Sequence, residues 1–425
     1  MTRNILHLDG DMTWLPKSVV CLSYYDLPRF RSDAFAALIL ALQLFPMAIA
    51  IAIAVGIHPL YGVYCAAIAG FLASALGDSK IRVTGPNVVF VAVASSIIAR
   101  EGVLGLSLST LLAGLLLVFL GAIGLGAAIQ MLPRPVAVGF STGIAVLVIS
   151  KQFPEILGIG SQIPDAQTPR GALTAVRHIA QAEPHALILA IATVLLMVGC
   201  RRISKYVPAG LIAITIGALL VKFAHFSVNT IASFYGSNRT SFDLHPTGAF
   251  RLGFVSSILA QAFALAVLVA IDSLQAMSLA TSLTGERFNP DSELLVQGGV
   301  NIASAFVGGL PTSGVSSYTS ANAHLGAQTP VAGILQAVFL LIFLLPTAPL
   351  LPFTPRPVIS AVILLGVCSM THWREIPQLL KLTRAEVTAW LVTAFLTIVT
   401  DLPIAVAAGM FIAMLLYIRK QKLSS

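Results

Sequence analysis

Charged side chains are scarce in this sequence. Aspartate, glutamate, lysine and arginine make up 10% of its 425 residues, whereas hydrophobic residues make up 57%. A soluble domain carries about 25% charged residues, so a chain of this length could not cover a water-exposed surface with so few. The composition therefore excludes a soluble enzyme, a nucleic-acid-binding protein and a coiled coil.

Cysteine is also rare. Cys21, Cys65, Cys200 and Cys368 show no paired spacing, which excludes a disulfide scaffold, and we interpret them as apolar packing residues. The sequence also lacks a His-rich or acid-rich cluster of the kind that an intramembrane enzyme would need. We therefore expect that the protein is not an enzyme.

Long apolar runs dominate the chain, and its length allows roughly a dozen spans of about 20 residues each. Splitting the runs at glycine, proline and charge gives about fourteen segments, which predicts an all-α polytopic membrane protein. The first seven are residues 34–56, 60–77, 84–99, 103–131, 135–150, 184–200 and 207–223. The second seven are residues 255–282, 292–308, 314–325, 329–351, 357–370, 385–400 and 403–418.

The third segment of each group is too short to cross a bilayer at about 1.5 Å per residue. Each follows a stretch with glycine and proline, Thr84-Gly85-Pro86 in the first group and Gly308-Gly309-Leu310-Pro311 in the second. Seven is odd, so the second group enters the membrane in the opposite orientation. Paired broken segments of this kind indicate an inverted-repeat transporter with a site at the membrane midplane. Re-entrant loops or wrongly divided spans are the alternative.

The positive charge is distributed as in a membrane protein. The formal net charge is +8, and placing the N-terminus inside puts most of the 25 lysines and arginines in cytoplasmic loops. We therefore expect both termini to be cytoplasmic. The partners that we expect are a small inorganic anion and the lipid bilayer, and we expect no binding of nucleic acid.

Hydroxyl groups are concentrated in residues 311–320. A helix beginning near Gly314 would leave unpaired N–H groups in the membrane, and those groups and the helix dipole attract an anion. Two half-helix N-termini facing each other would form an anion site without arginine or lysine, with Pro86 at a first helical position. The alternative is that these residues only cap helices and pack. The expected substrate-binding residues are Gln43, Thr84, Gly85, Pro86, Asn87, Ser316, Ser317 and Tyr318.

Asp272 lies deep in the eighth segment, with no basic residue in that segment. An acidic residue at a helix centre costs about 2.5–3.5 kcal/mol on insertion scales, so Asp272 must meet a cation, a proton or a hydroxyl cluster. We expect it to bind the coupling ion, with Na⁺ held by the carboxylate, backbone carbonyls and Ser316. A carboxyl group hydrogen-bonded to neighbouring hydroxyls, with no role in transport, is the alternative.

Three other residues carry lesser expectations. Pro46 should kink or unwind the first segment near the proposed site. Lys151 and Glu155 are expected to form a pair at the membrane edge.

A set of motifs follows in order along the chain, namely Pro46-Met47-Ala48, Gly56-Ile57-His58-Pro59-Leu60-Tyr61-Gly62-Val63-Tyr64, Ala75-Leu76-Gly77-Asp78-Ser79, Asp291-Ser292-Glu293-Leu294-Leu295, Gly308-Gly309-Leu310-Pro311 and Gly326-Ala327-Gln328-Thr329-Pro330-Val331-Ala332-Gly333. This ordered set resembles the SulP family, also called solute-carrier family 26, over roughly residues 26–420. It implies a 7+7 inverted repeat of fourteen segments in which a core domain carries the anion past a gate domain by an elevator-like motion. The anion would lie between the N-termini of segments three and ten.

The resemblance also implies the bounds of these domains. The core domain comprises 34–131 and 255–351, the gate domain 132–223 and 352–418, and the remainder is a cytoplasmic segment 1–33, an extracytoplasmic loop 224–254 and a cytoplasmic tail 419–425.

The sequence departs from the family pattern in segment ten. Many family exchangers have an arginine after a serine there, whereas Ser317 is followed by Tyr318. The run Asp272-Ser273-Leu274 instead resembles the acidic motif of cyanobacterial sodium–bicarbonate symporters in the family. In those proteins the sodium ligands match Asp272 and, in segment ten, Gly314, Val315 and Ser316. A further threonine ligand is replaced here by Ala276, which leaves proton coupling open.

A second departure concerns the C-terminal end. The family usually carries a cytoplasmic STAS domain after the last span, and this sequence ends seven residues after Ile418. The resemblance is therefore to the membrane domain without a STAS domain.

The leading hypothesis is a secondary active transporter of a small inorganic oxyanion, sulfate or bicarbonate, coupled to Na⁺ or H⁺. An uncoupled anion exchanger or channel, and a dicarboxylate or nucleobase carrier of the same fold, are the alternatives. We expect no cofactor apart from Na⁺ as the coupling ion, a homodimer formed through gate-domain contacts, and a location in the bacterial inner membrane.

Overall fold

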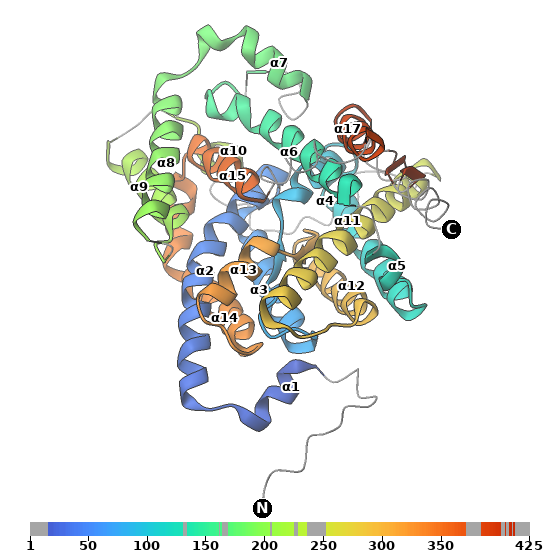
Figure 1. Ribbon diagram of the computed structural model, residues 1–425. Coiled ribbons are helices and arrows are strands. Elements are labelled where there is room, and N and C mark those ends of the chain that lie inside the picture. The colour runs from blue at the N-terminus through green and yellow to red at the C-terminus, as the bar shows by residue number, and fades with distance from the viewer. Residues whose placement is uncertain are drawn as a thin grey trace, which may run out of the picture.

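The structure is a computed structural model built almost entirely of helices (Figure 1). It describes residues 16–130, 134–160, 162–163, 169–204, 206–224, 228–235, 252–370, 384–400 and single positions between 404 and 412. Most of the predicted fourteenth segment, 403–418, and most of the predicted loop 224–254 lie outside these residues.

Seven of the described helices are long and apolar enough to cross a membrane, and three shorter ones are apolar too, which confirms the prediction of a multi-pass helical membrane protein. The long helices are α2 (Leu27–Val55), α3 (Pro59–Leu76), α4 (Val91–Ala122), α6 (Arg134–Ile156), α8 (Pro184–Ile203), α11 (Leu252–Thr284) and α14 (Val331–Thr347). The shorter apolar ones are α9 (Ala209–Ala224), α15 (Arg356–Met370) and α17 (Arg384–Val399). The other helices are α1 (Lys17–Cys21), α5 (Gly126–Gln130), α7 (Pro169–Arg177), α10 (Ile231–Tyr235), α12 (Pro290–Val307) and α13 (Ser316–His324).

Helix α2 shows how local sequence sets the limits of a span. The Asp26 side chain caps its first turn by accepting a 3.0 Å hydrogen bond from the Arg29 amide, and Gly56 ends it with φ of 100°. The helix continues through Pro46 to Val55, so the expected unwinding at this proline is not found.

The two short segments begin as strands rather than as helices. Strand β1 (Thr84–Pro86) pairs antiparallel with β2 (Thr312–Gly314), with Gly85 opposite Ser313. The prediction that Pro86 occupies a first helical position is therefore wrong, because Pro86 closes the strand and Asn87 caps the turn that follows. Gly102, with φ of 71° and ψ of −173°, interrupts α4 at the predicted boundary between segments three and four.

Close packing of glycines joins α4 to α12. A Cβ atom on Gly114 would lie 2.8 Å from the Gly298 carbonyl oxygen, and a Cβ atom on Gly298 would lie 2.7 Å from the Gly114 carbonyl oxygen. Small residues allow two helix backbones in a membrane to approach this closely. Helices α4 and α12 are therefore held at a short distance by backbone contact.

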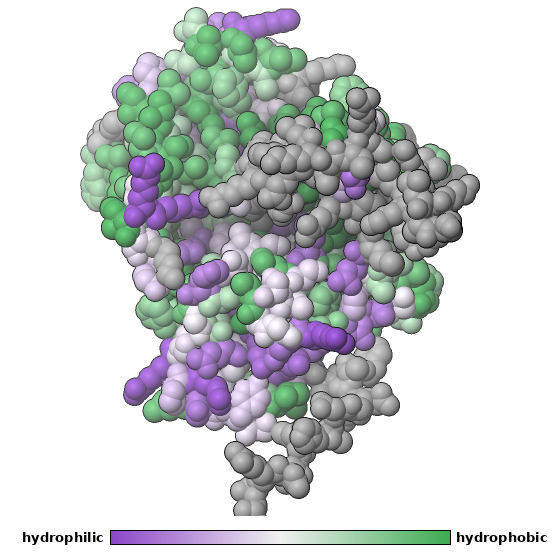
Figure 2. Space-filling model, in the orientation of Figure 1, coloured by the Kyte–Doolittle hydropathy of each residue, from purple (hydrophilic) through white to green (hydrophobic). Residues whose placement is uncertain are grey.

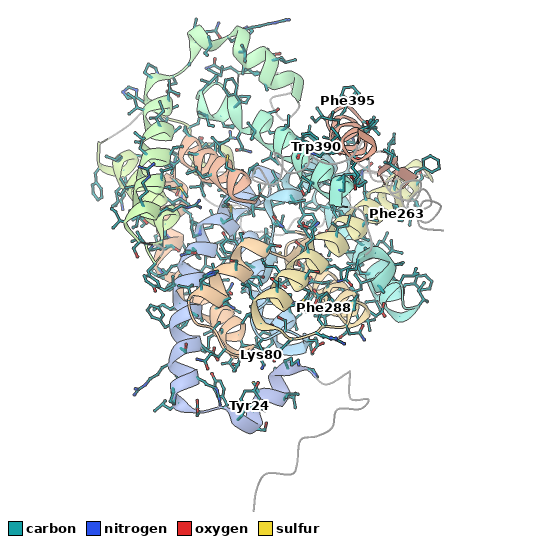
Figure 3. All side chains as sticks on the ribbon, in the orientation of Figure 1. Tyr24, Lys80, Phe263, Phe288, Trp390 and Phe395 are labelled. Carbon is teal, nitrogen blue, oxygen red and sulfur yellow. The ribbon has the colours of Figure 1, made fainter. Side chains whose placement is uncertain are left out.

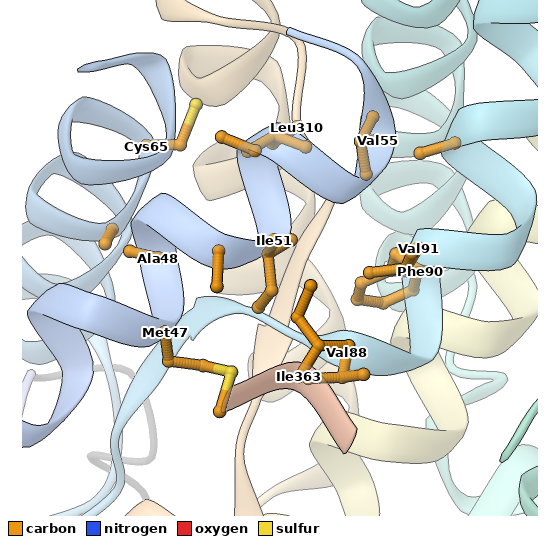
Figure 4. Packing of buried hydrophobic residues seen from close by; sticks show 14 of the residues in the cluster. Met47, Ala48, Ile51, Val55, Cys65, Val88, Phe90, Val91, Leu310 and Ile363 are labelled. Atoms are coloured by element: carbon orange, nitrogen blue, oxygen red, sulfur yellow. The ribbon is translucent and has the colours of Figure 1, made fainter. Parts of the chain in front are cut away.

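The main hydrophobic cluster surrounds the entry to α4. Figure 4 shows Met47 and Ile51 of α2 close to Val88 and Phe90, with Ile363 of α15 beside them. Phe90 is completely buried. This cluster brings elements predicted for the core domain and for the gate domain into contact.

Polar residues gather at the end of the molecule where α1 lies, whereas the surface over α8 and α9 is mainly hydrophobic (Figure 2). At the polar end the Lys80 ammonium lies 5.8 Å from the centre of the Tyr24 ring (Figure 3) and forms an ion pair with Glu286. Elsewhere large apolar side chains such as Phe263 and Phe395 project outward, as expected for a surface in contact with lipid.

Candidate functional site

The Asp272 carboxylate lies in the middle of α11 and is bound by both broken segments. Its Oδ2 accepts a 2.6 Å hydrogen bond from the Asn87 amide and a 3.1 Å hydrogen bond from the Ser313 hydroxyl. Asn87 also approaches Ser313 at 3.4 Å. Among the described residues no lysine, arginine or histidine forms an ion pair with Asp272.

The strand pairing explains why these side chains meet. Alternate residues of a strand point to opposite faces, so Asn87 lies on the same side as Gly85, opposite Ser313. The Gly314 amide donates a 3.0 Å hydrogen bond to the Ser273 hydroxyl, which holds β2 against α11. A Cβ atom on Gly314 would lie 2.9 Å from the Ala276 Cβ, so only glycine allows this approach.

The other face of the strands rests on polar residues of α12. Gln297 donates a 3.2 Å hydrogen bond to the Thr84 hydroxyl and a 2.9 Å hydrogen bond to Glu293, which forms a buried ion pair with Arg82. Asn301 both donates to the Thr312 carbonyl and accepts from the Thr312 amide, each at 2.9 Å. Because backbone groups in a membrane need internal partners, this network is what permits strands at this depth.

A cavity of about 380 Å³ opens next to the strand pair. Four of the predicted substrate-binding residues line it, namely Gln43, Pro86, Ser317 and Tyr318. The other lining residues are Pro46, Met47, Ile51, Val88, Met197, Arg201, Ser204, Val207, Ala209, Gly210, Ala321, His324, Leu325, Val362, Gly366 and Ser369. The cavity thus lies between α2, α13 and β1 on one side and α8, α9 and α15 on the other.

The remaining predicted residues lie around the cavity rather than in its lining. Thr84, Gly85 and Asn87 are buried in and next to β1, and Ser316 is the half-buried first residue of α13. Of the residues predicted for the coupling site, Gly314 contacts α11 as described, and the Val315 amide donates a 2.9 Å hydrogen bond to the Val83 carbonyl. Ser313, which the sequence reasoning did not select, contacts the Asp272 carboxylate instead.

Three further polar residues have surroundings that the sequence did not predict. Arg201 lines the cavity from the last turn of α8. Lys151 and Glu155 do not pair with each other. The Lys151 ammonium donates to the Ala92 carbonyl at 3.1 Å and to the Ser95 hydroxyl at 2.6 Å, while Glu155 pairs with Arg356 at 2.7 Å.

The arrangement is suited to binding rather than to covalent chemistry. Among the described residues there is no group of three or more His, Cys, Asp or Glu that could hold a metal ion. A small cation at Asp272 would depend on one carboxylate together with hydroxyl and backbone oxygens, a set that suits weakly held alkali ions. An anion in the cavity would meet hydroxyl groups, the start of α13 and Arg201.

Comparison with known proteins places this geometry in a family. The family model described as "Sulfate permease family" matches residues 30–393. The chain is 29% identical over 397 residues to the "Putative sulfate transporter YvdB" of Bacillus subtilis, which covers 93% of this chain and 75% of that protein. It is 26% identical over 406 residues to the bicarbonate transporter BicA of Picosynechococcus, covering 92% of this chain and 71% of that protein.

Solved structures agree with the sequence matches. The transmembrane domain of a cyanobacterial bicarbonate transporter BicA superimposes with a TM-score of 0.79 at 26% identity, covering 90% of this chain and 98% of that one. The murine anion transporter Slc26a9, in its inward-facing state, superimposes with a TM-score of 0.80 at 17% identity, covering 96% of this chain and 71% of that one. The likeness to Slc26a9 shows that the two proteins share a fold.

Proposed function

The chain belongs to the sulfate permease family, and on this premise we propose that it is a secondary active transporter of a small inorganic oxyanion, sulfate or bicarbonate, driven by Na⁺ or H⁺. The family consists of transporters, not enzymes. The names of the relatives, one a sulfate and one a bicarbonate transporter, support both candidate anions.

The anion binds in the cavity beside the start of α13. Gln43, Ser317 and Tyr318 offer polar groups there, while Pro86 forms part of the wall. Thr84, Gly85, Asn87 and Ser316 frame this site from β1 and from the first turn of α13. The partial positive charge at the start of α13 favours an anion.

The observation that carries the coupling proposal is that Asp272 is hydrogen-bonded from both broken segments at once. An anion near a bare carboxylate would be repelled. A sodium ion or a proton at Asp272 offsets that repulsion. The cation and the anion therefore bind together and cross the membrane together. The backbone carbonyls of Gly314, Val315 and Ser316 supply further oxygen atoms near this cation, and the Ser316 hydroxyl is left for the anion.

The domain organisation follows the 7+7 inverted repeat implied by the family. Residues 34–131 and 255–351 form the core domain, and residues 132–223 and 352–418 form the gate domain. The cavity lies between these two sets, so an elevator-like movement of the core would carry its contents across the membrane. Both termini are cytoplasmic, the chain resides in the bacterial inner membrane, and gate-domain contacts between two copies form a homodimer.

The test is uptake of labelled sulfate and bicarbonate into proteoliposomes, with Na⁺ and pH gradients imposed separately. The variant Asp272→Asn should lose gradient-driven uptake. The control Asp26→Asn changes an exposed carboxylate that caps α2 and should transport as the unmodified protein does, because asparagine caps equally well. Uptake that ignores both gradients and the Asp272 substitution would indicate an exchanger or a channel instead.

A further inference from the structure

Arg201 is the charged residue of the cavity. Of the described residues that line it, Arg201 alone carries a permanent charge, and none is a carboxylate. Much of the remaining wall is apolar and includes Met47, Ile51 and Val362. A single cation with low-dielectric walls around it concentrates its field in the cavity and raises the local concentration of anions.

A cation at this position in α8 also has an ordinary explanation. Basic residues in the last turn of a helix interact favourably with its dipole, and they mark cytoplasmic ends of spans. Arg201 and Arg202 both satisfy that explanation, since both lie in the last turn of α8. Only Arg201, however, is among the residues lining the cavity. An effect on transport that is seen when Arg201 is replaced, but not when Arg202 is replaced, therefore depends on the cavity.

The groups across the cavity complement Arg201. Ser317 and Tyr318 line it from the first turn of α13, and Gln43 lines it from α2. Ser369 lines it from α15, so α13 and α15 share this cavity with the side chain of Arg201. An anion between Arg201 and the start of α13 would thus have donors on two opposite sides.

We propose that Arg201 binds the transported anion directly, from the α8 side of the cavity, and makes the cavity select oxyanions over halides. The inference rests on the proposed function and adds a residue to its site. A guanidinium presents parallel N–H donors that match two oxygens of one oxyanion, whereas a spherical halide accepts only as a point charge. Because Arg201 supplies a positive charge in the cavity, segment ten does not need an arginine to bind the anion.

The kinetic consequence follows from the location of Arg201 outside the proposed core domain. The anion contacts Arg201 while the cavity is open on this side and leaves it when the core moves. Loss of Arg201 therefore weakens anion binding more than it slows the movement. The Michaelis constant for the anion should change much more than the maximal rate.

Three variants test this in proteoliposomes loaded with labelled sulfate or bicarbonate. Arg201→Gln should raise the Michaelis constant for the oxyanion about tenfold or more, the effect of losing one charged hydrogen-bonded pair. Arg201→Lys keeps the charge but loses the paired donors, so it should recover part of the affinity and become more sensitive to chloride competition. Arg202→Gln removes the neighbouring charge and should behave as the unmodified protein. Equal Michaelis constants in Arg201→Gln and Arg202→Gln would overturn the proposal.

Cys368 provides a binding readout that does not depend on transport. It is exposed and adjacent to Ser369 in the cavity wall, while Cys21 and Cys65 are buried. In a Cys200→Ser background, sulfate or bicarbonate should slow maleimide labelling of Cys368, and Arg201→Gln should shift this protection to about tenfold higher concentration. If the anion protects Cys368 equally well in Arg201→Gln, the proposed role of Arg201 is contradicted, whereas the proposed function is not. No uptake and no protection by either anion in the unmodified protein would contradict the proposed function itself.

Discussion

The side-chain amide of Asn87 donates a 2.6 Å hydrogen bond to the carboxylate of Asp272, across 185 positions of the chain. Ser313 donates to the same oxygen from the other broken segment. The carboxylate at the centre of α11 is thus joined to the residues that follow β1 and to β2 itself. If a cation binds Asp272 as proposed, these two hydrogen bonds provide a physical route from it to the residue after β1 and to β2, beside the proposed anion site.

Ser313 and Ser316 should have separable effects on transport. Ser313 contacts the Asp272 carboxylate, whereas Ser316 begins α13 next to the cavity-lining Ser317. Ser313→Ala should raise the concentration of the driving cation needed for half-maximal uptake several-fold, because the carboxylate loses a donor and the cation an oxygen ligand. Ser316→Ala should act mainly on the anion. Cation and anion titrations of uptake measure both, and identical profiles for the two variants would contradict the assignment.

The buried ion pair between Arg82 and Glu293 should be essential for stability. Each side chain is only 1% exposed, so removal of one partner leaves an uncompensated buried charge. Arg82→Gln or Glu293→Gln should lower the free energy of unfolding by about 3–5 kcal/mol. Thermal unfolding in detergent micelles measures the loss.

The matched control is the pair formed by Lys80 and Glu286, whose side chains are 30% and 31% exposed. Glu286→Gln should cost at most about 1 kcal/mol because solvent screens this pair. Similar losses for Glu293→Gln and Glu286→Gln would show that burial of the first pair contributes nothing.

The neighbours Gly298 and Gly299 should respond oppositely to a methyl group. A Cβ atom on Gly298 would lie 2.6 Å from a Val118 side-chain carbon, while nothing lies within 4 Å of one on Gly299. Gly298→Ala should therefore destabilise the protein by about 1–3 kcal/mol through overpacking. Gly299→Ala should be neutral or stabilising by up to about 1 kcal/mol, since alanine is the better helix former. Melting temperatures in detergent compare the two, and a stable Gly298→Ala protein would rule out the close contact of α4 with α12.

Lys151 should influence which side of the protein is open. Its ammonium is bound to the Ala92 carbonyl and the Ser95 hydroxyl of α4, across the proposed boundary between the gate and core domains. Lys151→Met removes both hydrogen bonds and should reduce the population of this conformation. The rate of Cys368 labelling should then fall by several-fold in the absence of substrate. Labelling at the original rate would show that Lys151 does not hold the two domains together.

Much of the fold follows from local features of the sequence. Long apolar runs predict the spans, because a helix that is apolar all round is stable only in lipid or in a protein interior. The break at Gly102 falls where the run of apolar residues is interrupted by charge and glycine. The strands of β1 and β2 could not be predicted, since three residues carry no period and their pairing depends on a partner more than 200 positions away.

The sequence predicts which kinds of residue form the candidate site but not which of them contact one another. Asp272 stands out because a carboxylate in an apolar helix needs a partner, and the partners Asn87 and Ser313 both lie in the stretches selected for their hydroxyl and amide groups. The sequence predicts that Lys151 pairs with Glu155, which lies one helical turn away. In the structure each finds a partner on another helix, because interhelical contacts in the interior outweigh a pair within one turn.

The amino-acid order alone determines which stretches form apolar helices, where these stretches break and that a carboxylate, Asp272, lies within one of them. These properties depend on hydrophobicity and backbone propensity, which act over a few residues. Tertiary packing decides which side chains face one another. Successive residues of a helix point about 100° apart, so Arg201 faces the cavity and Arg202 does not, although the two are identical in kind and adjacent in the chain. Such a difference is set by the rotation of α8 against its neighbours, and that rotation is a property of the whole packed bundle.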